Sequence, residues 1–142
     1  MKFFLDECLN VKVDGPLTDW LKKDEFLRSG AQTIPYGMQD IDLIEELAKL
    51  EVDAVFTSDL KQMNSPDRAR ERQAYRTHKI HWVGIPQSFV RGRIRPYAQA
   101  ANLLSAIHFV RNELETAKEP LAIELKRGFR KVDDPVSKMF RI

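Results

Sequence analysis

The sequence predicts an α/β fold in which helices cover both faces of a mainly parallel central sheet. Short apolar runs alternate along the chain with amphipathic segments of helical period, and no internal repeat or low-complexity segment interrupts them. The 142 residues suit a single domain, and the 43% hydrophobic content suffices for an ordinary core. We expect one domain over residues 1–142, with a core in 1–117 and a C-terminal strand and polar tail in 118–142.

Three elements are expected near the N-terminus. Residues 2–5 include a short apolar run, which predicts a buried strand. A glycine–proline pair then breaks the chain, and residues 17–26 should form a helix with Leu17, Trp20 and Leu21 on one face. Residues 31–34 lie between a glycine and a proline and are expected to form a second strand.

The middle of the chain carries the clearest helical pattern. Residues 40–50 place apolar side chains at helical spacing, and the apolar run at 52–57 predicts the next strand. Ser65 has the character of an N-cap and Pro66 that of a first helical residue, so a helix is expected over residues 65–77.

Four more segments complete the expected order. Residues 80–85 should form a strand, and 87–95 a loop. Residues 97–117 should form a long helix that packs partly on the sheet, and any apolar remainder is a candidate dimer interface. Residues 121–125 alternate like a strand, whereas 128–142 are polar and are expected to be a tail.

Charge is distributed unevenly along the chain. Residues 1–59 hold 6 Lys/Arg and 13 Asp/Glu, a balance of −7, whereas residues 60–95 hold 9 and 2, a balance of +7. An acidic portion that can hold metal followed by a basic portion that can hold phosphates is the layout expected of a nuclease. An ordinary solvated surface, whose charges mix in three dimensions, is the alternative.

Cysteine content and hydropathy favour a cytoplasmic protein. The single cysteine, Cys8, excludes an intramolecular disulfide and suits a reducing compartment. We expect Cys8 to be a small core residue rather than a nucleophile. The N-terminus turns acidic after three apolar residues, unlike a signal peptide, and no run reaches the ~18 apolar residues that span a membrane, so no membrane partner is expected.

Three aspartates stand where an α/β sheet would gather them at one edge. Asp6 follows the first predicted strand, Asp59 follows the strand at 52–57, and Asp40 opens a helix on its buried side. Converging carboxylates repel one another unless a cation neutralises them, and hard cations take oxygen ligands. The aspartates therefore predict a Mg²⁺ or Mn²⁺ site.

Each of these acids also has a structural interpretation. Asp40 could be an N-cap, and Asp59 a turn residue after a strand. Asp42 and Glu45 should face water as acids of the first helical turns. Glu7 is either an outer group of the metal site or a surface residue.

Other kinds of site are less well supported. His78 and His81 have no nearby cysteine or carboxylate to complete a zinc set, and the chain contains no Walker loop and no Gly-x-Gly-x-x-Gly. A receiver domain is excluded because no phosphoacceptor Asp ends a middle strand ahead of a well-separated Thr and Lys.

Short motifs around the three acids resemble those of a known family. They are Phe-Leu-Asp-Glu-Cys-Leu at residues 4–9, an Asp40 helix that ends in Glu-Leu-Ala, and Val-Phe-Thr-Ser-Asp-Leu at 55–60. The pattern resembles the PIN-like domains, particularly the toxin-type group related to VapC toxins. The resemblance covers roughly residues 1–90 and, more weakly, the helix at 97–117.

The resemblance implies a PIN-like three-layer α/β/α fold and a metal-dependent ribonuclease, often the toxin half of a toxin–antitoxin pair. Asp6, Asp40 and Asp59 match the family's acids and would hold Mg²⁺ or Mn²⁺. A cognate antitoxin and a homodimer are the implied protein partners. Many relatives carry a fourth acid about twenty residues after the third, but residues 77–81 contain no carboxylate and Asp67 is the nearest candidate. A catalytically inactive RNA- or protein-binding module is therefore the alternative.

The residues around the acids fit work on an RNA phosphodiester. Thr57 and Ser58 hydroxyls are auxiliary candidates for positioning a water or a carboxylate. Tyr75 or Phe89 could stack on bases, whereas Trp82 is expected in the core. The candidates for binding RNA phosphates are Arg68, Arg70, Arg72, Arg76, Lys79, Arg91 and Arg93.

Overall fold

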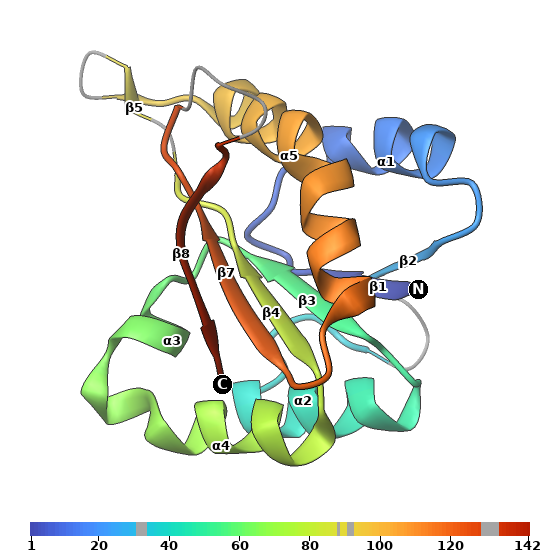
Figure 1. The fold of residues 1–142 in the computed structure, drawn as a ribbon, viewed down its shortest axis with the longest axis vertical. Helices are drawn as coiled ribbons and strands as arrows, with labels where there is room; N and C mark the ends of the chain where they lie inside the picture. The colour runs from blue at the N-terminus through green and yellow to red at the C-terminus, as the bar shows by residue number, and fades with distance from the viewer. Residues whose placement is uncertain (31–33, 88, 91–92, 129–133) are drawn as a thin grey trace.

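A computed structural model describes residues 1–30, 34–87, 89–90, 93–128 and 134–142. The main sheet has six strands in the order β2-β1-β3-β4-β7-β8, parallel except for β8, which runs antiparallel to β7 (Figure 1). Its strands are β1 Lys2–Leu5, β2 Glu25–Arg28, β3 Ala54–Thr57, β4 His81–Gly84, β7 Leu121–Leu125 and β8 Val136–Arg141. A separate antiparallel pair joins β5 Phe89–Val90 to β6 Arg93–Ile94.

Helices cover both faces of the sheet. The α-helices are α1 Asp14–Trp20, α2 Asp40–Lys49, α3 Lys61–Asn64, α4 Ala69–His78 and α5 Pro96–Thr116, with short 3₁₀ turns η1 Val11–Val13 and η2 Pro66–Arg68. One apolar cluster joins α1 and α5 to the sheet, and a second joins α2, α3 and α4 to it (Figure 1). Phe3 and Leu5 of β1 enter the first cluster and Phe4 the second, because successive strand residues point to opposite faces. The predicted α/β fold with a mainly parallel sheet is confirmed.

The order of the strands places a topological switch beside β1. The chain leaves β1 for its neighbour β2 on one side and then crosses to β3 on the other side. In open α/β sheets, the crevice beyond the carboxyl ends of the strands at such a reversal is the usual ligand site. Asp6 follows β1 and Asp59 follows β3, so both lie at this switch.

The helix expected over residues 17–26 is wrong in its second half. Helix α1 ends at Trp20, and Glu25–Arg28 instead pairs in parallel with β1 as strand β2. The aromatic ring of Phe26 lies 5.4 Å from that of Phe3. Of the three residues expected on one helical face, Leu17 and Leu21 are buried, but Trp20 is 55% exposed. Pairing with a buried strand has overridden a local helical pattern. Residues 31–33 of the strand expected at 31–34 lie outside the described residues.

Two other expectations are corrected towards the C-terminus. The loop expected at residues 87–95 contains β5 and β6, and the polar tail expected at 128–142 contains β8. Strand β8 pairs with β7, and most of its residues are exposed. An exposed strand needs no apolar residues, and its sequence therefore carries no apolar strand pattern that would have predicted it. It is nonetheless anchored, because Ile142 is buried and its N–H donates to Pro120 O at 2.9 Å. None of the helices in the described part of the chain is long and apolar enough to cross a membrane.

A buried carboxylate ties the N-terminus and β2 to α5. The Asp24 side chain is 1% exposed and accepts hydrogen bonds from the terminal amino group of Met1 and from Arg111 Nε, each at 2.7 Å. Burial raises the pKa of Asp24, but the hydrogen bonds of Arg111 and the amino group outweigh it, and the net pKa is lowered. The ionised carboxylate therefore stabilises the fold.

We predict that Asp24→Asn lowers the free energy of unfolding by roughly 1–3 kcal/mol at pH 7, because it removes the negative charge that pairs with the partly buried Met1 amino group and Arg111 guanidinium. The folded-state pKa lies below the ordinary value of 3.8, so the contribution is present above that value and is lost as the pH falls through the folded-state pKa. Urea unfolding of the wild type and the variant should show that the difference between their free energies of unfolding becomes smaller in acid. Asp19→Asn, at an exposed position nearby, is the control; equal losses in the two variants would contradict the prediction.

Candidate functional site

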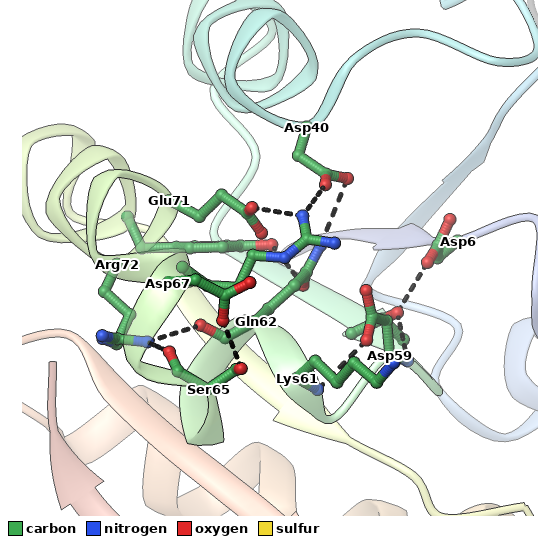
Figure 2. A network of polar contacts seen from close by, with 12 residues as sticks. Asp6, Asp40, Asp59, Lys61, Gln62, Ser65, Asp67, Glu71 and Arg72 are labelled. Carbon is green, nitrogen blue, oxygen red and sulfur yellow. Dashed lines mark hydrogen bonds and ion pairs between the residues drawn. The ribbon is translucent and has the colours of Figure 1, made fainter.

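The structure brings the three predicted aspartates together. Asp6, Asp40 and Asp59 line one cavity of about 150 Å³, although they come from β1, α2 and the turn after β3. Asp6 N–H donates to Phe56 O at 2.9 Å, which holds the ends of β1 and β3 side by side. Figure 2 shows the three carboxylates turned toward a common space. Their convergence therefore follows from the parallel pairing of two strands and the position of one helix start.

Thr57 positions two of the aspartates. Its side chain is fully buried, and its hydroxyl donates to Asp6 Oδ2 at 2.6 Å while accepting from Asp59 N–H at 3.0 Å. Asp59 Oδ1 in turn accepts from Lys61 N–H at 3.0 Å. The auxiliary residue Ser58 contributes its N–H, which donates to the sulfur of Cys8 at 3.1 Å. One threonine hydroxyl thus sets the relative positions of Asp6 and Asp59.

Cys8 lies at the edge of the cavity and not in the core, so the expected core position is wrong. The residue is exposed, and its sulfur contacts Asp6 Oδ2 at 3.0 Å and Thr57 Oγ1 at 3.4 Å. Desolvation of the sulfur and the negative charge of Asp6 raise the pKa of the thiol. A raised thiol pKa lowers the fraction of thiolate and hence the nucleophilicity of Cys8. Glu7, the second acid of the pair, is exposed beside Cys8 and lines the same cavity.

Asp40 is not the N-cap of its helix. The capping position belongs to Gln39, and Asp40 is the first helical residue. Its Oδ1 accepts from Gln62 Nε2 at 3.4 Å, and its Oδ2 is 2.9 Å from Arg68 Nη1. Asp42 and Glu45 are exposed, as the helical spacing predicted. The side chain of Asp40 is therefore available to the cavity rather than used in a cap.

Gln62 is a buried polar residue that the sequence analysis missed. It is 5% exposed, and its Oε1 accepts from Tyr75 Oη at 3.3 Å and from Trp82 Nε1 at 3.0 Å. These two donors fix the orientation of the amide, so its NH₂ faces Asp40. Tyr75 is 1% exposed, and stacking of a base on its ring is therefore ruled out in this structure. Trp82 is fully buried, as predicted.

A fourth carboxylate, Glu71, also faces this network, and it too was missed. Glu71 is 6% exposed, and its Oε1 lies 2.5 Å from Arg68 Nη1 (Figure 2). Desolvation raises the pKa of Glu71; the Arg68 guanidinium opposes this, and the charges of Asp40 and Asp59 add to the rise. Its position was detectable, since Glu71 stands four residues before the buried Tyr75 on one helical face.

The basic residues predicted to bind RNA have different environments. Arg68 pairs with acids, Arg72 Nη1 donates to Ser65 O at 2.6 Å, and Arg76 Nε donates to Ile142 O at 2.9 Å. Arg70 and Arg93 are exposed, on the first turn of α4 and on the hairpin that follows β4. The remaining candidates do not add to the cavity: Lys79 is exposed at the far end of α4, ahead of β4, while Arg91 and the Phe89 side chain lie outside the described residues.

The donor atoms around the cavity are of the chemical type that binds a hard cation. Asp6, Asp40 and Asp59 line the cavity with carboxylate oxygens, the ligands that Mg²⁺ and Mn²⁺ prefer, and Glu71 lies beside this lining, joined to Asp40 through Arg68. Glu71 Oε2 is buried and has no hydrogen-bond partner within the described part of the chain. In the arrangement seen here, however, no three His, Cys, Asp or Glu side chains among the described residues are grouped closely enough to hold a metal ion. Asp40 and Glu71 are instead bridged by Arg68.

Comparison with known proteins does not assign this chain to a family. No protein-family model matches the sequence, and no curated protein matches it. The evidence for function therefore comes from the fold and the carboxylate cavity.

We predict that Thr57→Val lowers the free energy of unfolding by roughly 1–3 kcal/mol, because it removes a charge-assisted hydrogen bond to Asp6 and leaves the Asp59 N–H without its acceptor. Thr57→Ser keeps the hydroxyl and should lower the free energy of unfolding by clearly less. Urea unfolding at pH 7 measures both changes. A valine variant as stable as the serine variant would show that the hydroxyl does not hold the site together.

Proposed function

We propose that this protein is a metal-dependent endoribonuclease that hydrolyses RNA phosphodiesters. The observation that carries the proposal is that Asp6, Asp40 and Asp59, from three separate segments, line one cavity at the switch point of a parallel sheet. Carboxylates gathered in one cavity need a cation, and a site at this position in an open α/β sheet is accessible to a ligand.

The residues suit this reaction class. Asp6, Asp40 and Asp59 would hold Mg²⁺ or Mn²⁺, which when bound supplies an activated water and neutralises charge on the phosphate. Thr57 keeps Asp6 and Asp59 in place by its two hydrogen bonds. The exposed guanidinium of Arg70 is one to which flanking phosphates can bind.

The resemblance to PIN-like, VapC-related toxins extends the proposal. On this basis the protein is the toxin component of a toxin–antitoxin pair, acts in the cytoplasm, and has a cognate antitoxin as partner. A homodimer belongs to the same proposal, but α5 offers little surface for it. Among the described residues of α5, Tyr97 is the one large apolar side chain that is exposed.

A second candidate is a PIN-like module that binds RNA or a protein without catalysis. The ion pairs that Arg68 makes with Asp40 and Glu71 favour it, since an arginine there neutralises the acids without metal. Such a module would bind RNA in a salt-dependent manner that is indifferent to Mg²⁺ and to the three aspartates.

We predict that Asp6→Asn, Asp40→Asn and Asp59→Asn each weaken Mn²⁺ binding and RNA cleavage by about 100-fold or more. Loss of a residue that only supports a metal ligand can already cost about 100-fold, and loss of a ligand itself should cost at least as much. Calorimetry with Mn²⁺ and cleavage of a single-stranded RNA, on the same samples, measure the two effects. Asp42→Asn, on the exposed side of α2, is the matched control and should change neither.

The two candidates give different results in this experiment. Metal binding that is lost with Asp59, together with metal-dependent cleavage, supports the nuclease. Full cleavage by two of the three Asn variants would overturn the site assignment. RNA binding without metal binding at millimolar concentrations would favour the non-catalytic module.

We predict that Arg70→Ala and Arg93→Ala each weaken RNA binding and reduce the slope of log affinity against log salt by about 0.7, the value for one phosphate contact to a single strand. Lys79→Ala serves as the control because Lys79, although exposed, lies at the opposite end of α4 from Glu71. Fluorescence anisotropy with a labelled RNA at several salt concentrations gives the slopes. A larger loss from Lys79→Ala than from the other two would place the RNA elsewhere.

A further inference from the structure

Arg68 stands between two carboxylates of the candidate site. It is the N-cap residue of α4, and its Nη1 lies 2.9 Å from Asp40 Oδ2 and 2.5 Å from Glu71 Oε1. Asp40 belongs to α2, so the guanidinium joins two helices that pack on the same face of the sheet. Figure 2 shows that the Asp40 and Glu71 side chains approach each other from these two helices.

This contact differs from an ordinary surface salt bridge. Exposed ion pairs contribute little because water solvates both partners. Here the Glu71 side chain is 8% exposed, so its charge depends on a nearby cation. The side chain of Arg68 is 34% exposed, so it can leave for solvent at a much smaller cost than Glu71.

Arg68 pairs with only one of the two carboxylate oxygens of Glu71. Glu71 Oε2 is buried and finds no hydrogen-bond partner within the described part of the chain. Asp40 and Glu71 both pair with the same nitrogen of Arg68, so these two acids share one cation. A buried carboxylate oxygen without a partner, next to further acids, is the situation that a bound cation relieves.

We propose that Glu71 is the fourth carboxylate of the metal site and that Arg68 is its internal counter-cation. In the metal-free protein Arg68 holds Asp40 and Glu71 together, and a divalent cation displaces it from both. The released guanidinium is then free, close to the Asp40 side of the cavity, to pair with an RNA phosphate in a forked geometry. The inference rests on the proposed function, since it names the chain's own competitor for the cation.

The proposal predicts that removing Arg68 strengthens metal binding, the opposite of what removing a ligand does. Arg68→Met keeps much of the aliphatic length of the side chain without its charge, and calorimetric titration with Mn²⁺ should show an affinity about tenfold higher than that of the wild type. Arg70→Met, two residues away on the exposed side, is the matched control and should change the affinity by less than about twofold. Glu71→Gln should lower the affinity by about tenfold or more.

The rise in melting temperature on adding Mn²⁺ provides a readout that a merely structural role of Arg68 would not move. Without metal, Arg68→Met should melt below the wild type, because Asp40 and Glu71 lose their cation. Saturating Mn²⁺ should raise the melting temperature of this variant more than that of the wild type. If Arg68→Met does not fold, Arg68→Lys replaces it, since it keeps a cation without the fork and should bind Mn²⁺ with intermediate affinity.

The outcomes separate this inference from the proposed function. If Arg68→Met binds Mn²⁺ as tightly as the wild type, or more weakly, Arg68 is not a counter-cation that competes with the metal. The proposed metal site itself would not be contradicted by that result. Unchanged affinity in Glu71→Gln would remove Glu71 from the site. Absence of Mn²⁺ binding in wild type and variant alike would overturn both proposals.

Discussion

The parallel pairing of β1 with neighbours on both sides is the constraint on which the rest of the structure depends. Phe3, Phe4 and Leu5 are fully buried, because helices cover both faces of the strand. A parallel strand cannot be joined to its neighbour by a tight turn, so the chain must cross over to β2 and again to β3. These crossovers create the switch point where Asp6 and Asp59 meet.

Bringing several carboxylates to one edge creates an electrostatic cost that neighbouring groups offset. Thr57 donates to Asp6 and accepts from the backbone of Asp59, while Gln62 is oriented toward Asp40 by the two donors on its other side. These contacts hold the acids in place without neutralising them. Only Arg68 supplies a charge in the ion pairs that the structure shows for these acids, and it serves the α2 and α4 side of the cavity. The site is thus preorganised on the strand side and adjustable on the helix side.

Sequence reasoning succeeded where a local pattern and the tertiary structure agree. The strand at residues 2–5 and the helix from Asp40 have burial patterns that follow directly from their apolar spacing. It failed at residues 25–28, where pairing with β1 overrode a helical pattern, and at β8, whose exposed residues carry no apolar signal. Glu71 was overlooked because the basic residues around it were interpreted as a surface that binds RNA phosphates.

The sequence by itself determined the alternation of strands and helices, and hence a mainly parallel sheet with acids placed after its strands, because burial periodicity is a local property of the chain. The tertiary structure alone decided which side chains share the cavity. Gln62 contacts Asp40 because α3 lies near the start of α2, and Arg68 joins Asp40 to Glu71 because α4 packs beside α2; no spacing along the chain encodes these contacts. Hydrogen bonds and ion pairs between elements depend on distances of a few tenths of an ångström, which only the packed core sets.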